Sequence, residues 1–379
     1  MSIQLRNLTA VAALAALLAA CGGKPADDAV DTSGVDTDEE KILNVWNWSD
    51  YIEESVLADF ETETGIKVNY EVGDSNEMLE TKLLAGRTGY DVVVPSASFL
   101  ARQIQAGIFQ KLDKSKLTNY ANNDPVILQN LAALDPGNEY SVNYMWGTSG
   151  VAYIEEKIAA AMPNAPVDSF AMFYDPNVIK NFEKCGVSML DAPSEVVGTV
   201  LMWLGKDANS ESLEDLKAAE EVLLKIRPYV RTIHSSNYID NLAGGEICLA
   251  LGWSGDVFQA ATRAEEAGKD FTIKYNIPKE GAVQFFDQLA IPVDAARVKN
   301  AHLFIDYLLR ADVAAKNSDY IAYANGNSAS LPLISEEVKS NPAIYPPPEV
   351  AAKLVPDTPE SADFTRELTR MWTRFRTGR

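Results

Sequence analysis

The feature that most constrains the fold is a regular change between two hydrophobic periods near the start of the chain. Alternating apolar residues predict strands, and segments with one apolar face predict helices. The order is strand, helix, strand, helix, strand, over Lys41–Trp48, Glu54–Thr64, residues 66–72, a helix opened by a capping box at Asp74 and Glu77, and Asp91–Pro95. This βαβαβ pattern is typical of an open α/β sheet.

The middle of the chain also contains both predicted strands and predicted helices. We expect strands at Ser141–Ile154, Ile247–Trp253 and Phe285–Pro292, and helices at Ser212–Leu224, Asp256–Ala267 and Ala301–Leu309. The first of these strands is long enough to be one strand or two, and to cross between lobes. About 340 residues are left for folding once a leader is set aside. That length favours two lobes, because single cores stop growing near roughly 250–300 residues.

The leader has three parts. Residues 1–20 carry one charge, at Arg6, and a short apolar run that ends in small residues, which predicts a secretory signal peptide. The sequence Leu18-Ala19-Ala20-Cys21 resembles the bacterial lipobox, so we expect a lipid on Cys21 and anchoring to the membrane. An ordinary signal peptide with a chance cysteine is the alternative. Residues 21–40 are polar and acidic, and we expect a lipidated, disordered tether there.

The net charge limits the classes of molecule that the protein is expected to bind. The formal net charge is −21, and it becomes −22 without the signal peptide, because Arg6 is the one charged residue in it. So strong an acidic balance argues against nucleic acid as a partner. It is compatible with a cationic ligand, although many soluble proteins are acidic.

Cysteines and histidines limit the chemistry further. If Cys21 carries lipid, Cys185 and Cys248 remain. In an oxidising compartment they form either a disulfide or two buried free thiols. The chain has two histidines, so we expect no histidine metal site. We find no Walker loop, Gly-rich dinucleotide motif or nucleophile motif, and we expect no cofactor and no enzymatic activity.

Aromatic and acidic residues recur together just after predicted strands, where open α/β sheets place their ligands. They are Trp48, Ser49, Asp50 and Tyr51 after the first strand, Ser96 after the third, Trp253 and Asp256 after residues 247–253, and Phe285 and Asp287 in a later strand. An aliphatic chain with ammonium ends needs flat apolar walls for its methylenes and carboxylates for its charges. Each residue alone has a simpler interpretation, since such aromatic residues are often core and Asp50 and Asp256 are candidate helix N-caps. The residues alone predict a ligand-binding α/β protein.

Longer strings carry a resemblance to a known family. They are WNWSDY (46–51), FETETGIKVNYEV (60–72), DSNEMLETKLLAGRTGYDVVVPSASF (74–99), IHSSNYI (233–239), GWSGDVFQA (252–260), IPKEGA (277–282), FFD (285–287) and YAN (323–325). Together they resemble the periplasmic polyamine-binding proteins, above all their putrescine-binding branch. The resemblance covers nearly the whole chain from Lys41 onward.

The resemblance implies a type II periplasmic binding protein, with two α/β lobes, a hinge and a ligand cleft between the lobes. The expected N-terminal lobe is 41–143 plus 264–311, and the expected C-terminal lobe is 148–260 plus 318–379. The expected hinge is 144–147, 261–263 and 312–317. The resemblance also implies a disulfide between Cys185 and Cys248.

Carried onto matching positions, the resemblance implies a set of ligand-binding residues. It consists of Trp48, Ser49, Asp50, Tyr51, Ser96, Glu195, Trp253, Asp256, Phe285, Asp287 and Tyr323. Two nearby positions, Phe258 and Gln284, depart from the family pattern and bear on the shape of the cleft. Phe285 in place of a larger indole favours the shorter diamine.

The implied function is capture of a polyamine, with putrescine preferred, for the permease of an ABC importer. We expect a monomer in the periplasm or at the cell surface. The alternatives are a protein that prefers spermidine and a sensor that presents polyamine to a receptor. A carboxylate-based hydrolase is a weaker alternative, because the paired acids belong to a cation-binding pattern.

Overall fold

The computed structural model of the protein describes residues 39–378. The predicted signal peptide, the lipid site Cys21 and the predicted tether up to residue 38 lie outside the described residues. Glu39 and Glu40, the last two residues of the predicted tether, contact the start of a helix near residue 298. The Glu39 carboxylate accepts hydrogen bonds from the backbone N–H groups of Lys299 and Asn300, at 3.0 and 2.9 Å.

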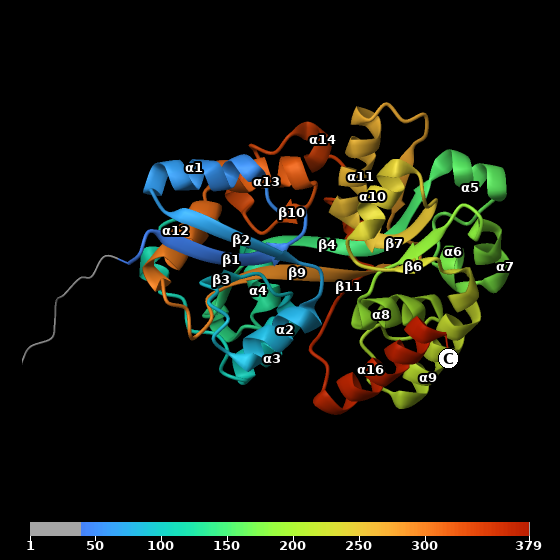
Figure 1. Ribbon diagram of the computed structural model, residues 1–379, viewed down its shortest axis with the longest axis horizontal. Helices are drawn as coiled ribbons and strands as arrows, with labels where there is room; N and C mark the ends of the chain where they lie inside the picture. The colour runs from blue at the N-terminus through green and yellow to red at the C-terminus, as the bar shows by residue number, and fades with distance from the viewer. Residues whose placement is uncertain (1–38, 379) are drawn as a thin grey trace, which may run out of the picture. The chain divides into compact units, whose positions relative to one another are not determined.

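The fold is a mixed α/β sheet with helices on both faces (Figure 1). The strands are β1 (Ile42–Trp48), β2 (Lys67–Gly73), β3 (Val92–Val93), β4 (Ser141–Ile154), β5 (Val187–Met189), β6 (Thr232–Ile233), β7 (Leu249–Trp253), β8 (Ile273–Asn276), β9 (Ala282–Ala290), β10 (Ala324–Asn325) and β11 (Leu354–Pro356). Their order in the sheet is β2-β1-β3-β9-β4-β7-β5-β6, with β8 and β10 also paired to β4 and β11 paired to β9.

The first five elements, β1, α1, β2, α2 and β3, alternate as the sequence predicts, and runs of consecutive helices follow later in the chain. They are α1 (Glu54–Thr64), α2 (Asn76–Ala85), α3 (Ala97–Gln105), α4 (Pro125–Leu131), α5 (Glu155–Ala161), α6 (Ala171–Tyr174), α7 (Pro176–Ile179), α8 (Pro193–Trp203), α9 (Leu213–Ile226), α10 (Asn237–Gly244), α11 (Ser254–Glu266), α12 (Val298–Leu308), α13 (Ala311–Ile321), α14 (Glu336–Lys339), α15 (Pro348–Ala351) and α16 (Ala362–Thr377).

Local chemistry explains where several elements begin and end. Helix α1 ends as predicted, because Gly65 adopts the left-handed conformation (φ 68°) that favours glycine. The capping box predicted at Asp74 is wrong by one residue. Ser75 is the N-cap of α2, and its hydroxyl accepts a hydrogen bond from the backbone N–H of Met78 at 3.3 Å.

Two long strands join the lobes. Ser141–Ile154 is a single strand, β4, and it pairs with β9 from Ser141 to Thr148 and with β7 and β8 beyond that. Figure 1 shows β4 and β9 running side by side through the middle of the sheet. One large buried cluster packs around β4 up to Met145 and the other from Val151 onward.

One of the three expected hinge segments lies between these two clusters, and the other two lie inside helices. Residues 144–147 lie in β4 between the two clusters. The ranges 261–263 and 312–317 lie inside α11 and α13. The lobe boundaries and the hinge therefore stay a prediction.

The predicted pair of cysteines forms a disulfide. Cys185 and Cys248 are bonded, with their Cα atoms 5.5 Å apart. Cys185 precedes β5 and Cys248 precedes β7, and these two strands pair in parallel. Cys248 is fully buried in the cluster that lies around β4 from Val151 onward, and Cys185 packs against that cluster. The bond therefore lies within one of the two large clusters.

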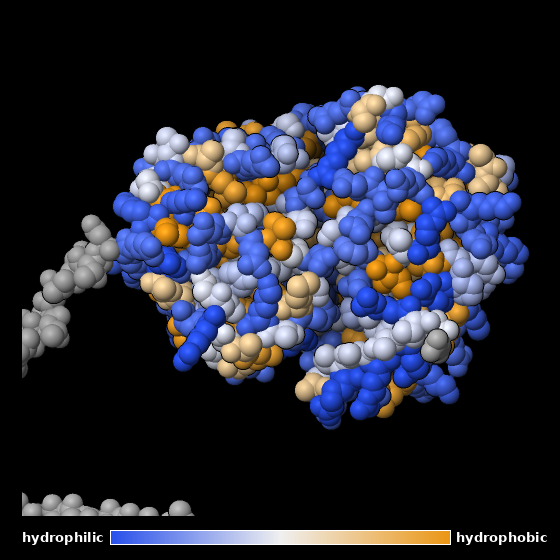
Figure 2. Space-filling model, viewed as in Figure 1, coloured by the Kyte–Doolittle hydropathy of each residue, from blue (hydrophilic) through white to orange (hydrophobic). Residues whose placement is uncertain are grey.

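Hydrophilic residues cover most of the face seen in Figure 2, and hydrophobic residues form separate groups on it. Within residues 39–378, we find no helix that is long and apolar enough to cross a membrane.

Candidate functional site

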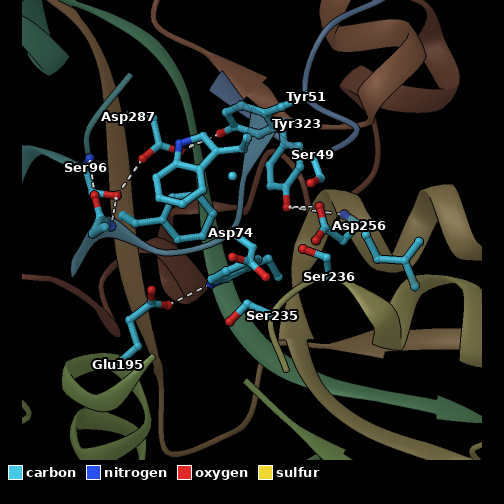
Figure 3. A pocket seen from close by; sticks show the side chains of 16 residues that line it. Ser49, Tyr51, Asp74, Ser96, Glu195, Ser235, Ser236, Asp256, Asp287 and Tyr323 are labelled. Atoms are coloured by element: carbon cyan, nitrogen blue, oxygen red, sulfur yellow. Dashed lines mark hydrogen bonds between the residues drawn. The ribbon is translucent and has the colours of Figure 1, made fainter. Parts of the chain in front are cut away.

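A cavity lies between the lobes at the ends of several strands (Figure 3). Its empty space is about 470 Å³, counted with the part that is open to solvent. Ten of the eleven predicted residues line it: Trp48, Ser49, Tyr51, Ser96, Glu195, Trp253, Asp256, Phe285, Asp287 and Tyr323. Residues from both lobes therefore meet around one space.

Asp287 on β9 is held by two hydroxyl groups. Tyr51 Oη donates a hydrogen bond to one carboxyl oxygen at 2.8 Å, and Ser96 Oγ donates to the other at 2.7 Å. Asn76 on α2 fixes Ser96 in turn, with its amide nitrogen 2.9 Å from the Ser96 hydroxyl. The Asp287 side chain is thus placed by segments that follow β1, β2 and β3.

Asp256 lies in the first turn of α11, and two tyrosines hold it. Tyr323 Oη donates to one carboxyl oxygen at 2.7 Å, and Tyr238 Oη donates to the other at 2.8 Å. The neighbouring Gly255 permits this arrangement, because a Cβ atom at that position would lie 2.2 Å from the Tyr323 ring. Asp256 is not the N-cap of α11, which was the simpler interpretation of this residue, since Trp253 occupies that position.

Glu195 in the first turn of α8 is the third carboxylate of the cavity. Trp253 Nε1 donates a hydrogen bond to its Oε2 at 2.8 Å, and the Ser149 hydroxyl donates to the same oxygen. Ser149 belongs to β4 and Trp253 ends β7. Figure 3 shows Asp256, Asp287 and Glu195 on different sides of the cavity, with aromatic rings between them.

These three residues, called the cavity carboxylates below, have no cationic partner. Within residues 39–378, no ion pair includes Asp256, Asp287 or Glu195. Burial raises the pKa of each to about 7, although the hydroxyl and indole donors act in the opposite direction. A buried carboxylate that is hydrogen-bonded but unpaired favours a cationic ligand.

Aromatic rings form the walls between the carboxylates. The Phe285 ring lies edge-on to Trp253 and to Tyr323, with centroid distances of 6.3 and 6.1 Å. Tyr51 lies edge-on to Tyr323 at 5.0 Å. Trp48 completes the wall and packs edge-on to the fully buried Trp46 at 5.0 Å. Such faces suit methylene groups and attract ammonium groups.

Comparison with known proteins fits this geometry. A family model described as bacterial extracellular solute-binding protein matches residues 55–346. The chain belongs to this family. As a solute-binding protein it carries its cavity where the two lobes meet.

Two relatives and one solved structure are similar to this chain over most of its length. The chain is 51% identical over 344 residues to the putrescine-binding periplasmic protein SpuD of Pseudomonas aeruginosa strain UCBPP-PA14, an alignment that covers 90% of this chain and 93% of SpuD. It is 51% identical over 343 residues to the putrescine-binding periplasmic protein PotF of Escherichia coli K12, with the same shares of the two chains. Among solved structures it is similar to the spermidine/putrescine ABC transporter substrate-binding protein PotD of Streptococcus pneumoniae, with a TM-score of 0.70, 28% identity, and coverage of 89% and 99%.

One predicted residue of the solute-binding protein lies apart from the cavity. Asp50 has a positive φ of 55°, and its carboxylate pairs with the guanidinium group of Arg263 on α11 at 2.5 Å. Asp50 is not the N-cap of α1 either, because Glu53 occupies that position. The Asp50–Arg263 pair instead joins the segment after β1 to helix α11.

Six lining residues were not predicted: Gly73, Asp74, Asn76, Ser235, Ser236 and Ile239. Gly73 ends β2 and Asp74 follows it, so the same strand-end rule that selected Trp48 could have found them. The last three belong to the string IHSSNYI, which carried the resemblance without any assigned role. Phe258 and Gln284, the two departures from the family pattern, are not among the residues that line the cavity.

Proposed function

We propose that the protein captures a polyamine, with putrescine preferred, and delivers it to the permease of an ABC importer. The observation that carries the proposal is a set of three cavity carboxylates around one aromatic-walled space, none of which forms an ion pair within residues 39–378. A protonated diamine supplies two positive charges and an aliphatic chain to fit between them. The names of the two relatives with 51% identity support the same ligand.

The proposed mechanism is a trap that closes. The open lobes admit the diamine, and closure excludes water, so that carboxylate and ammonium groups attract each other in a lower effective dielectric. Asp256 and Asp287 take the two ammonium ends, and Glu195 adds a third negative charge. Trp48, Trp253, Phe285 and Tyr323 pack against the methylenes.

The ligand is tested by calorimetric titration of putrescine, cadaverine, spermidine and spermine. The protein is first unfolded and refolded to remove ligand carried over from the cell. We expect micromolar or tighter binding of putrescine. Preference for spermidine would keep the mechanism and change the ligand, and absence of binding by all four amines would refute the proposal.

A role in transport is the proposal, and presentation of polyamine to a receptor is the alternative. A strain that lacks the gene should lose uptake of radiolabelled putrescine at low external concentration. Normal uptake together with a lost transcriptional or behavioural response to putrescine would favour the sensor. We propose a binding role without catalysis, because the cavity carboxylates receive hydrogen bonds that hold them as ligands for a cation.

We also propose that a lipid on Cys21 anchors the protein, and that the molecule is a monomer. The support is the lipobox-like sequence that ends in Cys21. Metabolic labelling with an alkyne fatty acid should mark the wild-type protein and not Cys21→Ala, and the variant should leave the membrane fraction. Labelling of both proteins to the same extent would contradict this assignment. Size-exclusion chromatography with light scattering tests the monomer.

A further inference from the structure

The hydroxyl group of Tyr238 has two partners in the candidate site, although Tyr238 itself lies outside the cavity. It donates a hydrogen bond to Asp256 Oδ2 at 2.8 Å and accepts one from the backbone N–H of Trp253 at 3.0 Å. Tyr238 is 1% exposed and is not among the residues that line the cavity. One buried hydroxyl therefore holds both a cavity carboxylate and a residue of the aromatic wall.

The packing around Tyr238 fixes its ring. The ring lies against Gly252, where a Cβ atom would come within 2.6 Å of it, and Gly252 directly precedes Trp253 in β7. Helix α10 carries Tyr238 in its first turn, next to Ser236 and Ile239, which line the cavity. Close packing of this kind restricts where the hydroxyl group can point.

Among the described residues, four hydroxyl groups donate to the two aspartates of the cavity, and that of Tyr238 differs from the others. Three of them belong to Tyr51, Ser96 and Tyr323, which line the cavity, so that a bound ligand can contact them (Figure 3). Tyr238 is not a lining residue. Its hydrogen bond to Asp256 is therefore shielded from the ligand.

The charge of Asp256 depends on few neighbours. Burial raises its pKa to about 7, and the hydroxyl groups of Tyr323 and Tyr238 act in the opposite direction. Other charged or titratable side chains that act on Asp256, or on which its charge acts, are Asp50, Arg263, Asp287 and Tyr51. Asp50 and Arg263 have opposite effects and form an ion pair with each other. The two tyrosine hydroxyls are thus the direct hydrogen bonds that favour the anion.

A carboxylate attracts an ammonium group strongly only while it is ionised, and burial without a cation disfavours that state. We propose that Tyr238 is a positioning residue, which holds the carboxylate of Asp256 as an anion, aimed into the cavity, before the ligand arrives. It acts through Asp256 and does not touch the ligand. This inference rests on the proposed function, because an amine is the ligand that needs the anion.

The substitution Tyr238→Phe tests the inference, because it removes the hydroxyl group and keeps the ring. Loss of one hydrogen bond to a charged group should raise the pH at which Asp256 ionises in the empty site by about one pH unit. The affinity for putrescine should then fall about fivefold at pH 7. At pH 9, where Asp256 is ionised in both proteins, it should fall by less than about 1.5-fold. Calorimetric titration at both pH values measures the difference.

Proton release gives a second readout, which a merely structural role would not move. Titrations in two buffers of different ionisation enthalpy count the protons that are released for each putrescine bound. At pH 7 we expect Tyr238→Phe to release about 0.4 proton more than the wild type, because a larger fraction of Asp256 is protonated in its empty site.

Tyr174→Phe is the matched control. Tyr174 is also 1% exposed and belongs to the same buried cluster as Tyr238. Its hydroxyl group lies 2.6 Å from the hydroxyl of Thr199 and contacts no carboxylate. We expect the affinity for putrescine to change by less than about twofold at both pH values, with no change in proton release. Thermal unfolding shows that both variants are folded.

Two results would overturn the inference about Tyr238. One is an equal loss of affinity at pH 7 and pH 9, which would mean that the hydroxyl serves only the backbone of Trp253. The other is unchanged affinity together with unchanged proton release at pH 7. In both cases, binding of putrescine by the wild type would leave the proposed function standing. If the wild type binds no amine, both proposals fail.

Discussion

Replacing Asp287 by Asn should make the ligand-free protein more stable while it weakens ligand binding. Burial raises the pKa of Asp287 from its ordinary value of 3.8 to about 7. The folded state therefore holds its proton more tightly than the unfolded state. The free energy of unfolding falls as the pH rises from about 4 to about 7, and it stays at the lower value above that.

The size of the effect follows from the shift. Three pKa units correspond to about 4 kcal/mol of stability lost at pH 8. Asn cannot accept from both Tyr51 and Ser96, and the lost hydrogen bond costs about 1 kcal/mol. We therefore expect Asp287→Asn to gain about 3 kcal/mol at pH 8, or about 4 °C in Tm for a chain of this length. At pH 4.5, where Asp287 is already protonated, the gain should disappear.

The same Asp287→Asn substitution should weaken the binding of putrescine. Loss of the charge partner should weaken putrescine binding by about 2–5 kcal/mol, which is about 30-fold to several thousand-fold. Asp91→Asn is the matched control, because Asp91 is also fully buried but pairs with Arg297 at 3.2 Å. It should lower stability by about 3–5 kcal/mol and leave the putrescine affinity unchanged.

Differential scanning calorimetry at both pH values, with and without putrescine, measures these changes. If empty Asp287→Asn is less stable than the wild type at pH 8, or if its gain is the same at both pH values, the reasoning about an unpaired charge is refuted.

Three further predictions follow from the same geometry. The affinity for putrescine should fall as the pH falls from 8 to 5, because the cavity carboxylates, with pKa values of about 7 in the empty site, then take up protons; a constant affinity in calorimetry would contradict this. Gly255→Ala should weaken binding by about 1–3 kcal/mol, because the new Cβ would displace the Tyr323 ring, and unchanged affinity would show that the contact is relieved elsewhere. Replacing both Cys185 and Cys248 by Ser should lower stability by about 4 kcal/mol on the chain-entropy estimate, and an unchanged urea midpoint would contradict it.

The sequence predicted the elements that are set by local pattern. The bounds of α1 and β4 match the prediction, because their hydrophobic periods are strong and Gly65 ends the helix. The N-cap of α2 was placed one residue early, since Asp74 and Ser75 are both good caps and only the backbone geometry selects between them.

The site was predictable only where a residue follows a strand or belongs to a recognised string. Asp256 and Asp287 met that condition. Asp50 met it too, but its positive φ turns the side chain toward Arg263. Tyr238 supports Asp256 from a segment with no local sign of that role.

The position of the disulfide suggests that it affects how long the protein resists unfolding but not how the protein captures its ligand. Cys248 lies in the buried cluster around β4 from Val151 onward, and Cys185 packs against it, so the bond joins segments of one cluster. It makes no link to the other large cluster, so reduction should leave the proposed opening and closing of the cleft unchanged. A reducing environment should therefore shorten the lifetime of the protein against unfolding and proteolysis without acting as a switch on capture. Redox state would then govern how long the folded protein persists, whereas ligand concentration and pH would govern how much of it is occupied.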